Sequence, residues 1–143
     1  MIKPAAVLPT DEPAIVGTVF RTPLVTKGKT WFPLTQLITW PIMGWIAKKR
    51  IPQRSWLQSM GVGAVTMPIV LGSEWCHNLA HAAAAYVVGK PMDAIRITWG
   101  LPLLVYYDIT DQDVTPRQHV IRALGGPLFN VLVIPVALYY RYH

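Results

Sequence analysis

Long apolar segments alternate with short polar ones along this chain. Residues 31–47 carry no charge, and residues 60–88 carry none except at Glu74. A third apolar segment occupies residues 119–140. Segments of about 17–25 mostly apolar residues are long enough to cross the hydrocarbon core of a bilayer as helices. The pattern therefore predicts about three transmembrane helices, at 31–47, 60–88 and 119–140. The first is at the lower limit of length for a span, so an interfacial helix is its alternative.

Glycines and capping residues divide the second apolar segment. Glycine and proline are concentrated in its first half, which predicts a bend or a helix restart near Gly72. Ser73 is then expected to cap a helix from Glu74 to Val88. Gly89 is a typical residue for ending such a helix.

The third segment has its own start and break signals. Thr115 followed by Pro116 is a favourable helix start, because threonine can cap the helix and proline suits its first position. The Gly-Gly-Pro sequence at 125–127 predicts an interruption of the helix.

Two other regions favour extended structure. A hairpin is predicted at about 92–108, between the last two helices, because two β-rich runs flank Gly100-Leu101-Pro102. Residues 14–20 form a short alternating run that could make one edge strand. This strand would lie within an extended polar arm at 1–30. The expected fold class is a mainly α membrane protein in which 31–143 form a single membrane domain.

Composition supports a membrane protein. Of the 143 residues, 52% are hydrophobic and 14% are charged. The chain is therefore more apolar and less charged than an average globular domain. The formal charge of +6 comes from basic residues in tails and loops, which argues against nucleic acid and for anionic lipid headgroups. Membrane lipids and other membrane subunits are the expected partners. Multi-pass insertion in a plasma, inner or energy-converting membrane is the expected localisation.

The candidate chemistry lies in the second segment, SEWCHNLAHAAAAYVVG. Glu74, His77 and His81 fall within about 60° of one another around a helix. Histidines spaced i, i+4 can bind one metal ion together, and ionisable groups at membrane depth usually pair, ligate or line a cavity. Glu74 could be a metal ligand or a partner that lowers the cost of burying His77. Cys76 is off this stripe and is expected to be a small buried residue.

The same segment resembles the first core helix of the site-2 protease family of intramembrane zinc metalloproteases. That family has HExxH, an alanine-rich helix and a glycine eight residues beyond the second histidine, which Gly89 matches after His81. The sequence ALGGPLFN at 123–130 resembles the family's Gly-Pro-x-x-Asn signature on a later helix. The resemblance implies that Gly126, Pro127 and Asn130 line the cleft or pack helices together.

Two departures from the family pattern bear on activity. Asn78 occupies the position of the glutamate that serves as general base in the family, and an amide cannot accept a proton. The family's third zinc ligand, an aspartate in a downstream Leu-Asp-Gly segment, has no counterpart in the sequence. A third bond could come from Glu74 or from the loop aspartates Asp108, Asp111 and Asp113.

The resemblance and its departures imply a catalytically inactive, site-2-protease-like membrane protein that acts as an accessory subunit of a larger membrane complex. Zinc could be retained by His77, His81 and Glu74, or lost. Two alternatives remain open. The chain could be an active zinc metalloprotease that uses Glu74 as its base, or a subunit in which histidine ligates haem or chlorophyll.

Overall fold

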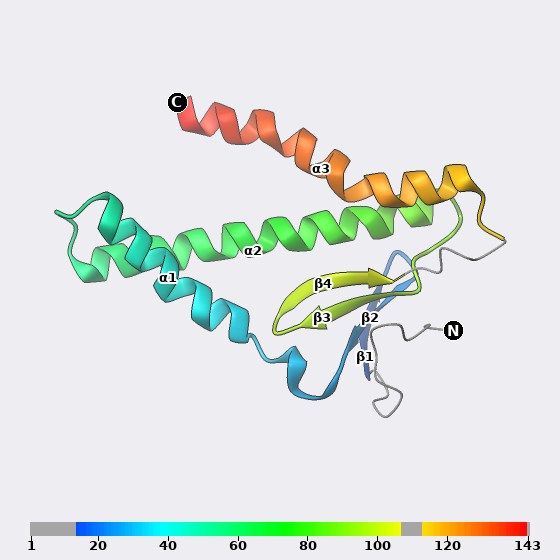
Figure 1. The fold of residues 1–143 in the computed structure, drawn as a ribbon, viewed down its shortest axis with the longest axis horizontal. Helices are drawn as coiled ribbons and strands as arrows, with labels where there is room; N and C mark the ends of the chain where they lie inside the picture. The colour runs from blue at the N-terminus through cyan, green and yellow to red at the C-terminus, as the bar shows by residue number, and fades with distance from the viewer. Residues whose placement is uncertain (1–13, 107–112, 143) are drawn as a thin grey trace.

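The computed structural model describes residues 14–106 and 113–142. Within these ranges the protein is mostly helical, with one small mixed sheet (Figure 1). In chain order the elements are β1 (Ala14–Val19), β2 (Thr22–Thr26), the 3-10 helix η1 (Gly28–Trp31), α1 (Leu34–Arg50), α2 (Trp56–Val87), β3 (Ala94–Thr98), β4 (Leu101–Tyr106) and α3 (Pro116–Tyr142).

The sheet has the strand order β1-β2-β3-β4. β1 pairs with β2 and β3 pairs with β4 in antiparallel fashion, whereas β2 and β3 are parallel. The predicted hairpin between the last two helices is therefore confirmed as β3 and β4. The edge strand predicted at 14–20 is confirmed as β1, which lies at one edge of the sheet. β2 was not predicted, and it places this segment beside the hairpin. Residues 1–13 lie outside the described residues.

Both hairpins turn through two residues with positive φ. Phe20 and Arg21 have φ of 47° and 59°, and Trp99 and Gly100 have φ of 52° and 85°. Such turns match the twist of antiparallel strands but usually contain glycine or asparagine. The Phe-Arg turn was not evident from the sequence for this reason. It packs on α2, where the Arg21 guanidinium lies 5.7 Å from the ring centroid of Tyr86.

α2 runs without interruption from Trp56 to Val87. The predicted restart at Gly72 and the predicted cap at Ser73 are therefore wrong. Ser55 caps the start of the helix. Its side chain accepts a hydrogen bond from the Gln58 amide, and the Gln58 side chain accepts one from the Ser55 amide. Packing along the whole helix outweighs the local preferences of its glycines and proline.

Two other predicted helix boundaries are confirmed, but the first helix covers Leu34–Arg50 and not 31–47. It extends past residue 47 because basic side chains in a last turn offset the helix dipole. Gly89 has φ of +74° and, with the amide of Lys90 bonded to the Ala85 carbonyl at 3.0 Å, ends α2. α3 begins at Pro116, and Thr115 caps it through reciprocal hydrogen bonds with Gln118.

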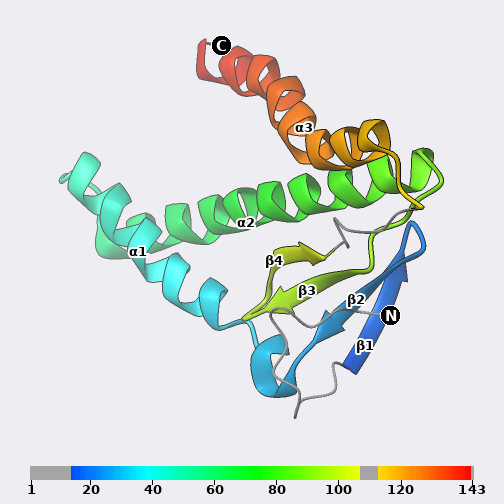
Figure 2. The same cartoon turned by 45° about the vertical axis from the view of Figure 1, so that its right-hand side comes forward.

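The predicted interruption at 125–127 does not occur. α3 is continuous through Pro127 and Pro135, although both views show it changing direction along its length (Figures 1 and 2). Proline within a helix removes a hydrogen bond and bends the helix without ending it. The first part of α3 runs beside α2, and the remainder diverges from it.

α2 lies between the sheet and α3, as both views show (Figure 2). The N-terminal part of α2 packs on α1 through small residues. Only glycine fits at position 63, because a Cβ there would lie 2.6 Å from the Gly44 nitrogen. The tip of the β3-β4 hairpin joins the two helices. The Gly100 carbonyl accepts hydrogen bonds from Gln36 on α1 at 2.9 Å and from Trp75 on α2 at 3.3 Å.

The buried core is small compared with the exposed apolar surface. Ile95 and Val25 are almost completely buried in the sheet, and Ala82 and Ala85 are buried on α2. Many large apolar side chains on all three helices are exposed, including Leu132 at 73%. Within the described ranges, one helical stretch, Pro116–Tyr139, is long and apolar enough to cross a membrane.

Candidate functional site

The two histidines of the HxxxH sequence lie against each other on α2. Their Nε2 atoms are 3.2 Å apart, and their ring centroids are 4.9 Å apart with the planes at 78°. Both side chains are partly buried. The i, i+4 spacing therefore brings the two rings together as the sequence predicts.

The backbone of α3 fixes the orientation of His81. Its Nδ1 atom lies 2.8 Å from the carbonyl oxygen of Arg122. Since a carbonyl oxygen can only accept a hydrogen bond, Nδ1 is the protonated nitrogen. In the neutral ring, Nε2 then presents its lone pair toward His77. Metal-binding histidines are commonly held in this way, by a hydrogen bond to the nitrogen that does not bind the metal.

Two consecutive glycines on α3 allow this close approach. A Cβ atom on Gly126 would lie 2.5 Å from Cε1 and Nε2 of His77 and would also overlap His81 Nε2. A Cβ atom on Gly125 would lie 2.9 Å from the backbone carbon of Ala80 and from Cα of His81. Any larger residue at either position would push the two helices apart.

The spacing of the two imidazoles suits a shared metal ion. Two nitrogens bound to one tetrahedral zinc ion are about 3.3 Å apart, close to the 3.2 Å between His77 and His81. Within the described residues, no group of three His, Cys, Asp or Glu side chains could hold a metal. Asp108 and Asp111 lie outside the described residues, and Asp113 is exposed.

Asn78 lies between the histidines in sequence but turns its amide to the helix backbone. Its Nδ2 atom donates to the Glu74 carbonyl at 2.9 Å. Glu74 is exposed, and within the described part of the chain its carboxylate has no hydrogen bond or ion pair. The expected pairing of Glu74 with His77 is therefore not found there, because His77 contacts His81 instead.

The remaining predicted site residues lie at the edge of the site. Pro127 and Asn130 are exposed on α3, beyond the glycines that contact the histidines. Cys76 is exposed on α2, so the prediction that it is buried is wrong.

Arg122 is a site residue that the sequence analysis missed. It is 2% exposed, its carbonyl orients His81, and its Nη2 atom donates to the Pro91 carbonyl at 3.4 Å. The signal in the sequence was a lone charge within the apolar segment 119–140. Such a charge is costly in an apolar environment and is usually retained for a specific contact.

Comparisons with known proteins give no family assignment. The chain matches no family model, no curated protein and no solved structure. The chemistry of the site is therefore inferred from the residues on α2 and α3 and from their geometry.

Proposed function

We propose that this protein is a non-hydrolytic, site-2-protease-like integral membrane protein that serves as an accessory subunit of a larger membrane complex. The observation that carries the proposal is the direct contact between the two segments that resemble the family's motifs. Gly126 of the Gly-Gly-Pro sequence meets both imidazoles of the HxxxH sequence.

This contact is more specific than either motif alone. HxxxH occurs in many chains without a functional role, but here a segment more than 40 residues away orients one of the histidines through the Arg122 carbonyl. Glycine at 125 and 126 is needed for that approach. A site that positions an imidazole in this way is organised for ligation more than for simple packing.

Asn78 is the reason for proposing that the scaffold does not hydrolyse peptides. Zinc proteases use a carboxylate next to the metal to take a proton from the attacking water. The Asn78 amide cannot do so, and it donates to the helix backbone. Glu74 lies one turn earlier and is exposed, so a role as a replacement base receives no support from its position.

The histidine pair nevertheless fits two of the bonds of a zinc site. His77 and His81 would hold the ion through Nε2, with a further ligand supplied from outside the set of described residues. Bound zinc would polarise a carbonyl or a water molecule. In this proposal the ion joins two side chains of α2 at the place where Gly126 of α3 meets that helix.

The exposed apolar surface supports membrane insertion and a partner. Large apolar side chains are exposed along α1, α2 and the second half of α3. Patches of this kind mark contact with lipid or with other proteins. We propose that all three helices lie in the membrane, and that the half of α3 which diverges from α2 contacts another subunit.

Extraction of native membranes tests this proposal. The full-length chain is expected to stay in the membrane during alkaline carbonate washing and to migrate in a mild detergent as a complex larger than its monomer. Replacing Leu132 with glutamine, on the exposed part of α3, is expected to release the chain from that complex. Gln53→Ala, an exposed change in the loop between α1 and α2, is the control and should leave the complex intact. A chain removed by carbonate would contradict membrane insertion, and a monomer in mild detergent would contradict the subunit role.

A further inference from the structure

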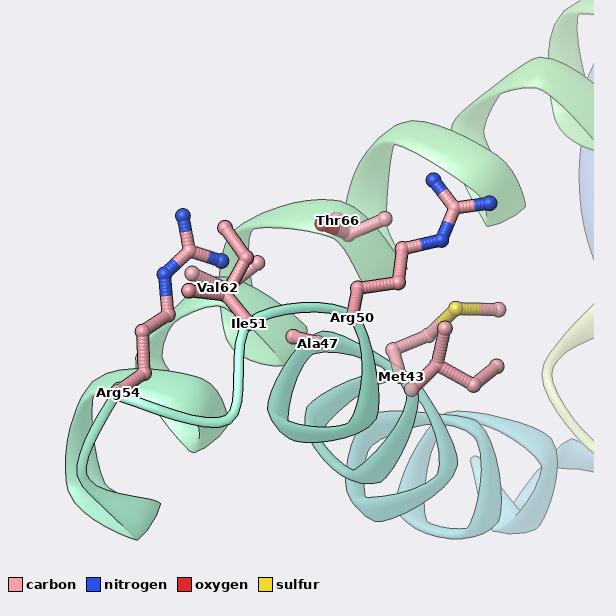
Figure 3. Close-up of a pocket in the computed structure, with 8 residues that line it drawn as sticks. Met43, Ala47, Arg50, Ile51, Arg54, Val62 and Thr66 are labelled. Atoms are coloured by element: carbon pink, nitrogen blue, oxygen red, sulfur yellow. The ribbon is translucent and has the colours of Figure 1, made fainter.

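A pocket lies between the end of α1 and the beginning of α2 (Figure 3). It is separated from the histidine pair by about 20 Å along α2, at 1.5 Å per residue. Its volume is about 440 Å³, which is within the usual range for small-molecule sites. Eight residues line it: Met43, Ile46, Ala47, Arg50, Ile51, Arg54, Val62 and Thr66.

The lining combines an apolar surface with two positive charges. Five of the eight residues are apolar, one is threonine, two are arginines, and none is acidic. Figure 3 shows Arg50 and Arg54 on opposite sides of Ile51 and Val62. A ligand that satisfies both features must carry a negative group together with an apolar portion.

The two arginines are available for a ligand. Within the described residues, neither guanidinium group has a hydrogen bond or an ion pair. The neighbouring Lys48 differs, because its Nζ atom donates to the Pro52 carbonyl at 2.7 Å and so closes the end of α1. Basic residues in the last turn of a helix can simply offset its dipole. That explanation does not cover Arg54, which lies beyond the end of α1.

The surroundings of the pocket suit the headgroup region of a membrane. Trp45 and Trp56 are 53% and 55% exposed on either side of the loop that joins the two helices. Lys49 lies over the Trp45 ring, 5.2 Å from its centroid. Tryptophan beside lysine and arginine is typical of the boundary between headgroups and acyl chains.

We propose that this pocket binds an anionic phospholipid. The anionic headgroup is held by Arg50 and Arg54, whose flexible side chains turn toward it from opposite sides of Ile51 and Val62 and offer several N–H donors. The acyl chain lies on Met43, Ile46 and Val62, in the apolar part of the pocket. This inference rests on the membrane placement proposed above and is independent of the histidine pair.

Lipid analysis of the purified chain tests the inference. The full-length chain is placed in nanodiscs of phosphatidylcholine and phosphatidylglycerol in equal amounts and then transferred to a mild detergent. The lipids that remain bound are measured by native mass spectrometry. We expect the wild type to retain phosphatidylglycerol in preference to phosphatidylcholine. Arg50→Gln and Arg54→Gln should each reduce that preference about fivefold, the effect expected for one basic residue at an anionic surface.

Matched variants show whether the lipid preference comes from the pocket arginines or from the net positive charge of the protein. Lys29→Gln combined with Arg117→Gln removes two exposed charges elsewhere and should leave the preference unchanged. Arg50→Lys combined with Arg54→Lys retains charge without the paired donors and should give an intermediate value.

Three results would overturn the inference. The first is an equal loss of preference in the pocket variants and the double control. The second is unchanged lipid binding in the pocket variants with loss of a partner subunit, which would assign the pocket to a neighbouring helix. In either case the chain would still resist carbonate extraction. The third, a chain that carbonate removes from membranes, would overturn the membrane placement as well.

Discussion

Replacing Gly125 with alanine is expected to lower the free energy of unfolding by about 3 kcal/mol, the upper end of the effects of overpacking. The new Cβ would meet backbone atoms of Ala80 and His81 at 2.9 Å. Backbone atoms cannot rotate aside as a side chain does, so α2 and α3 must separate. Denaturant titration in mild detergent, followed by circular dichroism, measures the change.

Gly72 on α2 provides the matched control. A Cβ there would meet nothing within 4 Å, so Gly72→Ala should raise the free energy of unfolding by up to about 1 kcal/mol through helix propensity. Opposite signs for the two glycine-to-alanine changes are the expected result. Equal effects at positions 72 and 125 would contradict the close packing of α3 on the histidine helix.

Removal of either histidine is expected to lower zinc affinity more than tenfold. Loss of a group that only orients a ligand already reduces metal affinity by about 10–100-fold, and His77 and His81 are proposed as the ligands themselves. Zinc binding to the full-length chain can be measured by competition with a zinc-sensitive dye. His77→Ala and His81→Ala should both show the loss.

Two further variants make this test specific. His119→Gln removes a histidine outside the pair and should leave zinc affinity unchanged. Gly126→Ala should weaken binding, because its Cβ would displace the imidazoles. Equal zinc affinity in the wild type and in His77→Ala would contradict the assignment of the site. Absence of zinc binding by the wild type would make the histidine pair a purely structural contact.

Features of the fold with local causes could be predicted from the sequence. Gly89 and Thr115 mark helix boundaries through their own backbone and side-chain chemistry, and both were found where expected. Features with distant causes could not. The continuity of α2 through Gly72 depends on packing against α1, α3 and the sheet, and the Phe20-Arg21 turn depends on Tyr86 in the last turn of α2.

The candidate site also has features with local causes, which the sequence predicts, and features with distant causes, which it does not. The contact between His77 and His81 follows from their spacing on one helix. The Arg122 carbonyl that orients His81 is a backbone atom on another helix, and no side-chain motif specifies it. The sequence shows Arg50 and Arg54 only as basic residues, because the apolar surface between them arises when α1 and α2 pack together.

The most direct test of the proposed function is a cleavage assay in bilayers. The full-length wild type, in nanodiscs with added zinc, is incubated with transmembrane peptides, and the products are analysed by mass spectrometry. Because the proposed function places the Asn78 amide where a hydrolytic site needs a general base, we predict no more cleavage than with the combined His77→Ala and His81→Ala variant. Zinc-dependent cleavage by the wild type that disappears in the histidine variant and in Glu74→Gln would contradict the account and identify an active protease.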